Sequence, residues 1–117
     1  MVQDKTTIGV TAENQRTLDT LEEQGSFADQ MDAARFALAF AIRSHVAPGA
    51  VEGTSTKWNV GSFDPDRSLS AVINAIFPEQ SAPYRAVEGL INEGLQLLQL
   101  RINDDGYFEP IEVIDSV

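Results

Sequence analysis

One stretch of this sequence constrains the fold more than any other, because its apolar residues cover more than one face of a helix. The stretch runs from Phe27 to Ser44 and reads FADQMDAARFALAFAIRS. Its apolar side chains recur at helical spacing in two stripes, formed by Met31, Ala34, Leu38 and Ala41 or Ile42 and by Phe36 and Phe40. A single packing partner covers only one stripe. The pattern therefore predicts a buried central helix between its own domain and a second body, such as another copy of the chain.

Length and charge limit the classes of protein that this chain can belong to. Its 117 residues are enough for one domain over 1–117 with a modest core. The net charge of −10, from 8 basic and 18 acidic side chains, opposes unaided binding to nucleic acid or to an anionic membrane. The N-terminus lacks a signal-peptide pattern, and no apolar run has the roughly 20 residues that span a bilayer. We therefore expect a cytoplasmic protein with no membrane partner.

Before the central helix, the sequence predicts a strand and a first helix. Residues 5–10 alternate between two faces, as in a short strand. Thr11 supplies an N-cap for a helix over 12–24. Ser26 is predicted to cap the central helix, with Asp29 in a capping-box-like position three residues later.

After the central helix, 47–56 is rich in glycine, alanine, serine and threonine and is predicted to be a loop or linker. The second half, 57–117, is predicted to be mostly helical. It consists of a short strand or extended segment, two amphipathic helices and an extended tail, over 57–63, 65–77, 82–101 and 107–117. Asp64 is the predicted N-cap of the first of these helices. Together these elements predict an α+β fold that is mostly α.

Residues 5–44 resemble the ribbon-helix-helix family, in which a short strand is followed by two helices. The matching residues are Thr7 to Val10 in the strand, Leu18 and Leu21 in the first helix, Gly25 to Phe27 at the tight link, and Ala34 to Leu38 in the second helix. In that family two chains pair their strands into an antiparallel ribbon, and their second helices intertwine around the dyad. The resemblance implies that 5–44 is a dimerisation half, in a homodimer or a higher even-numbered homo-oligomer.

The same resemblance implies two sets of site residues. In the family, outward residues of the ribbon enter the DNA major groove, and the N-terminus of the second helix anchors a phosphate. Carried over to this sequence, the DNA-facing set is Lys5, Thr7 and Gly9 on the strand, with Ser26 and Phe27 at the turn. The implied dimer interface is formed by Ile8, Val10, Met31, Phe36, Leu38 and Phe40.

The layout of the chain is also similar to the small E subunits of DNA-phosphorothioation (Dnd-type) systems. In those subunits a ribbon-helix-helix start is followed by further helices, and the subunits self-assemble as accessory factors. The similar layout here is the segment WNVGSF at 58–63, followed by LSAVINAI at 69–76. This resemblance implies a non-enzymatic accessory or regulatory protein that is associated with DNA.

The charge distribution leaves a second function open. Asp29 and Asp32 lie in the first turns of the central helix, where the phosphate would bind, and Gly9 has no side chain to contact a base. The alternative is an acidic protein-interaction or assembly module without DNA binding, whose partner would be a basic protein.

No reaction chemistry is recognisable in the sequence, so we expect neither an enzyme nor a small-molecule substrate. His45 is the only histidine, and we expect it to cap the central helix or face solvent. The acidic residues lack the spacing of a calcium loop, and the glycines match no phosphate-binding loop, so no metal and no cofactor are expected. Four aromatic residues either pack in the core or form an interaction surface: Trp58, Tyr84, Tyr107 and Phe108.

Overall fold

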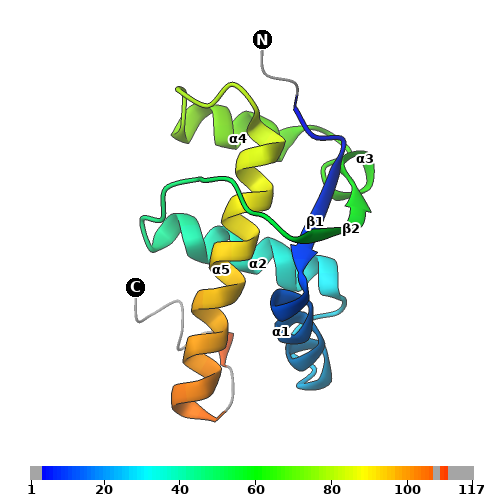
Figure 1. The fold of residues 1–117 in the computed structure, drawn as a ribbon, viewed down its shortest axis with the longest axis vertical. Coiled ribbons are helices and arrows are strands. Elements are labelled where there is room, and N and C mark those ends of the chain that lie inside the picture. Colours follow the sequence, from blue (N-terminus) through cyan, green and yellow to red (C-terminus); the bar gives the residue numbers. More distant parts are fainter. Residues whose placement is uncertain (1–3, 107–108, 111–117) are drawn as a thin grey trace.

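The computed structural model describes residues 4–106 and 109–110 of the chain. In that part it has an α+β fold in which helices predominate over one small sheet (Figure 1). The elements in chain order are β1 (Thr7–Thr11), α1 (Ala12–Glu23), α2 (Gln30–Arg43), β2 (Thr54–Asn59), α3 (Val60–Phe63), α4 (Ser68–Ile76) and α5 (Pro83–Asp105). The predicted C-terminal extended segment, with Tyr107 and Phe108, lies outside the described residues apart from Glu109 and Pro110.

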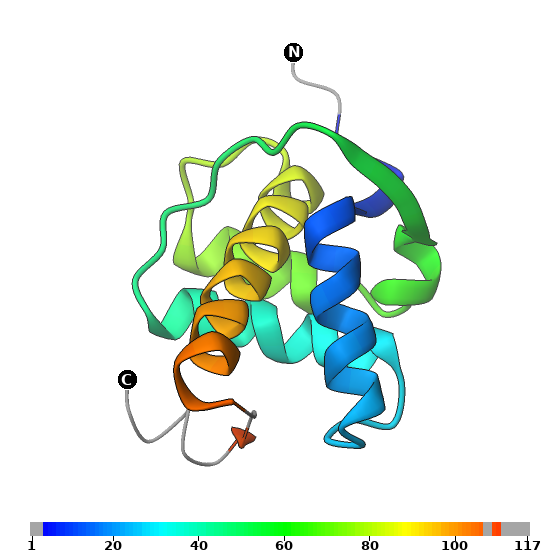
Figure 2. The same ribbon diagram turned by 60° about the horizontal axis from the view of Figure 1, so that its bottom comes forward.

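The longest helix, α5, packs against α1, α2, α4 and β1. Helix α2 crosses it, and α1 lies beside it on the same side as the sheet (Figures 1 and 2). The crossing of α2 and α5 is close because a glycine stands at the contact: a Cβ atom on Gly94 would collide with the carbonyl oxygen of Ala37. The two halves of the sequence therefore share a single core, which contains Ile8 and Leu18 as well as Leu90 and Leu95.

The strand β1 pairs with β2 of the same chain in an antiparallel two-stranded sheet. Ile8 lies opposite Trp58 and Gly9 lies opposite Thr56, so β2 has one extra residue, Lys57, at a bulge. Part of the predicted linker over 47–56 is thus a strand. In the ribbon-helix-helix family the corresponding strand pairs with a second chain, whereas here this edge of β1 is occupied within the chain.

The other edge of β1 is occupied by two polar side chains of α5. Glu88 accepts a hydrogen bond from the Gly9 amide at 2.8 Å. Asn92 accepts one from the Thr11 amide at 3.1 Å and donates one to the Gly9 carbonyl oxygen at 3.1 Å. Glu88 and Asn92 are both buried, so they replace a neighbouring strand for this edge. Both edges of β1 are therefore hydrogen-bonded inside one copy of the chain.

Two predicted helix starts are wrong in detail. The N-cap of α2 is Asp29, which accepts a hydrogen bond from the Asp32 amide, and not Ser26. Helix α4 begins at Ser68 rather than at residue 65, after a turn in which Arg67 has a left-handed backbone with φ of 62°. The Asp64 carboxylate nevertheless caps α4, because it accepts hydrogen bonds from the amides of Leu69 and Ser70.

Candidate interaction surface

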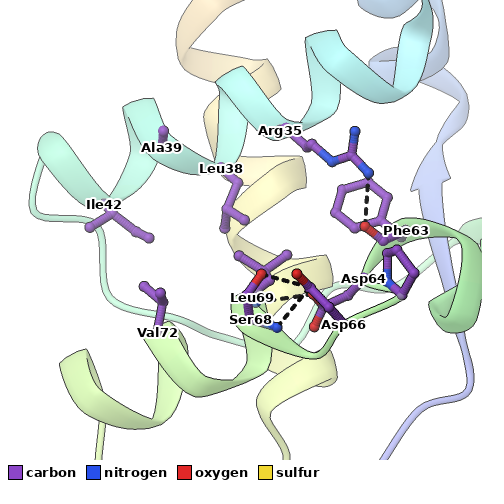
Figure 3. Close-up of a pocket in the computed structure, with 11 residues that line it drawn as sticks. Arg35, Leu38, Ala39, Ile42, Phe63, Asp64, Asp66, Ser68, Leu69 and Val72 are labelled. Carbon is purple, nitrogen blue, oxygen red and sulfur yellow. Dashed lines mark hydrogen bonds between the residues drawn. The ribbon is translucent and has the colours of Figure 1, made fainter.

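A groove lies between α2 and α4, and we call it the α2–α4 groove (Figure 3). Its volume is about 520 Å³, which is within the range of small-molecule sites. The residues that line it come from one face of α2, from the turn before α4, and from α4 itself: Arg35, Leu38, Ala39, Ile42, Phe63, Asp64, Pro65, Asp66, Ser68, Leu69 and Val72. Most of these side chains are apolar, and the polar ones gather at one end.

Helix α4 has an unusual composition for the surface of so acidic a chain. It reads SLSAVINAI and carries no charged residue. Only Ile73 is buried, whereas Val72 and Ile76 are 47% and 45% exposed. Val72 and Ile76 are four residues apart, so they lie on the same side of the helix, and Val72 also lines the groove. Contiguous exposed apolar residues are more typical of interaction surfaces than single ones are.

Arg35 is held in place at the polar end of the groove. Its guanidinium donates a hydrogen bond to the Phe63 carbonyl oxygen at 2.9 Å and lies 5.2 Å from the centroid of the Phe63 ring. Asp32 is a second, weaker partner at 3.4 Å. The Phe63 ring in turn contacts the Trp58 ring, with 5.4 Å between centroids. The Arg35 guanidinium is thus held against the Phe63 ring. The Arg35 side chain remains 44% exposed, so a carboxylate of another molecule can reach it.

Asp64 fixes the position of α4 at the same end. Its carboxylate is buried and accepts a third hydrogen bond, from the Tyr84 hydroxyl of α5, at 2.9 Å. Burial, together with this hydrogen bond, raises the pKa of Tyr84 above its ordinary value. Nearby, hydrogen bonds from the hydroxyl and amide of Ser68 lower the pKa of Asp66, which is fully exposed. Since Asp64 has a complete set of partners in the fold, we assign it a structural role.

The structure places the predicted DNA-facing residues in or close to the core. Lys5 forms an ion pair with the buried Glu88, with 2.7 Å between Nζ and Oε1. Gly9 is buried and Thr7 is half-buried. Ser26 and Phe27 are half-buried at the link before α2, where the Phe27 ring contacts that of Phe36. The five residues therefore do not form one exposed surface.

The predicted dimer-interface residues also pack within the chain. Ile8, Val10, Leu38 and Phe40 are buried, and Met31 and Phe36 are half-buried against the same core. The chain's own core thus accounts for their apolar character. Of the six, only Leu38 lines the α2–α4 groove.

Two further observations concern the described residues alone. Within 4–106 and 109–110, no three histidine or acidic side chains lie close enough together to hold a metal ion. None of the helices in this part of the chain is both long and apolar enough to cross a membrane.

Comparisons with protein families, with curated proteins and with solved structures find no match to this chain. The geometry of the groove is therefore the basis for proposing a function. Of the residues that line the groove, sequence reasoning placed only Leu38 in a candidate site, and it missed the others, including Arg35, Ala39, Ile42 and Val72. One signal was present in the sequence: within the predicted amphipathic helix over 65–77, residues 68–76 carry no charge, in a chain of net charge −10.

Proposed function

We propose that this protein is a non-enzymatic protein-interaction module, and that the α2–α4 groove is its docking surface. The observation that carries the proposal is the open apolar groove beside the uncharged helix α4, whose Val72 and Ile76 remain about half exposed. An amphipathic helix that lays its apolar face into such a groove is a common mode of recognition between proteins.

Of the two functions that the sequence leaves open, we propose the interaction module without DNA binding. Three features weigh against DNA as the partner. Lys5 is engaged by Glu88, Gly9 is buried, and the Asp29 carboxylate caps the N-terminus of α2, where a phosphate would otherwise bind. The overall charge of −10 adds a repulsion that only local basic residues would overcome.

The fluorescent probe anilinonaphthalene sulfonate tests the docking surface, because it is apolar and carries one negative charge that matches Arg35. We expect saturable binding to dilute protein, which Val72→Glu abolishes. Leu100→Glu is the matched control, because Leu100 is 59% exposed on α5 and does not line the groove. Equal binding by both variants, or no saturable binding by the parent protein, would contradict the proposal.

The competing function needs its own measurement, which is the fluorescence anisotropy of a labelled DNA duplex at low salt. Low salt gives weak contacts to phosphate their greatest strength. We expect no saturable change in anisotropy. Binding that weakens as salt is added would instead favour the DNA-associated function of ribbon-helix-helix type.

A further inference from the structure

We propose that the occupant of the α2–α4 groove is a second copy of this chain, with α4 of each copy lying in the groove of the other. This inference rests on the proposed function, since it names the partner of the same surface. The resulting homodimer differs from a ribbon-helix-helix dimer, because helices and not strands form the contact.

The first argument is that the chain itself supplies the kind of segment that the groove accepts. The groove needs an apolar helix, and α4 offers Val72 and Ile76 on a face that the rest of the chain leaves about half exposed. Helix α4 lines the groove and also has this unpartnered apolar face. A two-fold axis beside α4 therefore places the apolar face of each α4 in the groove of the other copy. Such an interface is isologous, so the same patch serves both copies.

The distribution of acidic residues over the helices also bears on where two copies can meet. Two chains of net charge −10 repel one another and can meet only where carboxylates are few. Helix α1, for comparison, carries four acidic residues and one arginine. Helix α2 carries two arginines and one aspartate, and α4 carries no charge. Although Asp64 and Asp66 also line the groove, α2 and α4 therefore present a second acidic copy with less repulsion than α1 does.

The positions of Arg35 and Arg43 on α2 favour one specific arrangement of the two copies. Arg35, Ala39 and Arg43 are four residues apart in sequence, so Arg43 continues the stripe that borders the groove. Figure 3 shows that α2 and α4 run in the same direction, from Arg35 and Ser68 at one end to Ile42 and Val72 at the other. With the two-fold axis perpendicular to α4, the α4 helix of the second copy runs in the opposite direction. This orientation brings the Asp66 carboxylate, which lies just before α4 in the second copy, toward Arg43 of the first copy.

Sedimentation equilibrium over a range of protein concentrations tests the dimer. We expect the parent chain to form dimers, and we expect Val72→Glu and Ile76→Glu each to weaken dimerisation roughly thirtyfold or more, as for a central anchor of an interface. Leu100→Glu, with the same change of charge outside the groove, should dimerise like the parent. A parent chain that stays monomeric at the highest concentration reached would overturn the inference. A dimer that only Leu100→Glu disrupts would overturn it as well.

The geometry has a separate test, since the chain contains no cysteine. A Val72→Cys variant should form a disulfide-linked dimer on mild oxidation, because the two copies of this residue face each other near the axis. Leu100→Cys should give no such product above the background of random collisions. Arg43→Glu should weaken the dimer roughly tenfold at low salt, because two exposed charge pairs are lost. Efficient cross-linking through Leu100→Cys but not through Val72→Cys would contradict this arrangement.

The probe measurement separates failure of this inference from failure of the proposed function. If the second copy occupies the groove, binding of anilinonaphthalene sulfonate should fall as the protein concentration rises and dimers form. If the probe binds in a Val72-dependent way while the parent chain stays monomeric, the groove is a docking surface whose occupant is a different protein. If neither probe binding nor dimerisation depends on Val72, both proposals fail.

Discussion

The two faces of α2 differ in how closely the rest of the chain packs against them. The face toward α5 is closed: Ala37 meets Gly94 at backbone distance, and the neighbouring Ala33, Ala34 and Ala41 are fully buried. The face toward α4 is open, and Leu38, Ala39 and Ile42 border a groove on that side. Small residues allow close approach on the first face, whereas nothing within the described chain fills the space beside the second.

This difference separates the residues that carry the fold from those available to a partner. Closely packed backbones tolerate no added atom, because neither side can move without disturbing its helix. The exposed residues of the groove, such as Ala39 and Val72, tolerate substitution in the isolated chain, because their side chains have few contacts to lose. Substitutions on the two faces of α2 should therefore have opposite effects on stability and on assembly.

The largest effect is expected on the closed face. Gly94→Ala places a methyl group against the Ala37 carbonyl oxygen, and we expect a loss of about 3 kcal/mol or more in the free energy of unfolding. Urea denaturation followed by circular dichroism measures this loss. Gly61→Ala is the matched control, because a Cβ atom there meets no atom within 4 Å. Equal stability of the two variants would mean that α2 and α5 are not closely packed.

The next largest effect concerns the closed edge of β1, where α5 supplies the polar partners. Asn92→Ala removes the partner of the Thr11 amide and of the Gly9 carbonyl oxygen. It also removes one of two acceptors of the Asn14 side-chain amide, the Asn92 Oδ1 at 2.7 Å. We expect a loss of roughly 2 kcal/mol, because buried polar groups are left without partners. Faster amide hydrogen exchange at Thr11 than in the parent would locate the effect. An unchanged exchange rate would indicate that this edge is not bound by α5.

A smaller effect is expected at the junction of α5 with the start of α4. Tyr84→Phe removes one of three hydrogen bonds to the Asp64 carboxylate, at a cost of about 1 kcal/mol near neutral pH. The raised pKa of Tyr84 adds a dependence on pH. The unfolded chain releases the phenolic proton at a lower pH than the folded chain does, so stability should fall as the pH rises above the ordinary tyrosine value of 10.0. Thermal unfolding at several alkaline pH values should show a shallower fall for Tyr84→Phe than for the parent.

Local sequence signals predicted most of the elements of this fold. The predicted helices over 12–24 and 82–101 and the central helix correspond to α1, α5 and α2, because apolar periodicity and capping residues are local properties. The partner of β1 was not predicted. The strand β2 begins with Thr54, Ser55 and Thr56 after Gly53, a run of small polar residues that is typical of loops. It pairs with β1, which is distant in the sequence, and no local pattern specifies such a contact.

The candidate site was less accessible to sequence reasoning. Two apolar stripes on α2 correctly indicated a helix with more than one apolar face, but Phe40 of the second stripe is buried in the core. The open face combines Leu38 and Ile42 of the first stripe with Arg35 and Ala39, which belong to neither stripe. Glu88 and Asn92 read as surface positions of a helix because they are polar, yet they are buried against β1. In each case the packing of distant segments decides which side faces outward.

The smallest effect on stability is expected on the open face, and it gives the sharpest contrast with Gly94→Ala. Val72→Glu should change the free energy of unfolding of the monomer by no more than about 0.5 kcal/mol, because the side chain is 47% exposed and the new carboxylate stays in water. Urea denaturation of dilute protein measures this change under conditions where dimers dissociate. Val72→Ala is the matched control, since it shortens the side chain without adding charge. If Val72→Glu instead destabilised the monomer as strongly as Gly94→Ala, the contact between α4 and α2 would be part of the hydrophobic core. The role of α4 would then be to cover α2 within the chain and not to bind a partner.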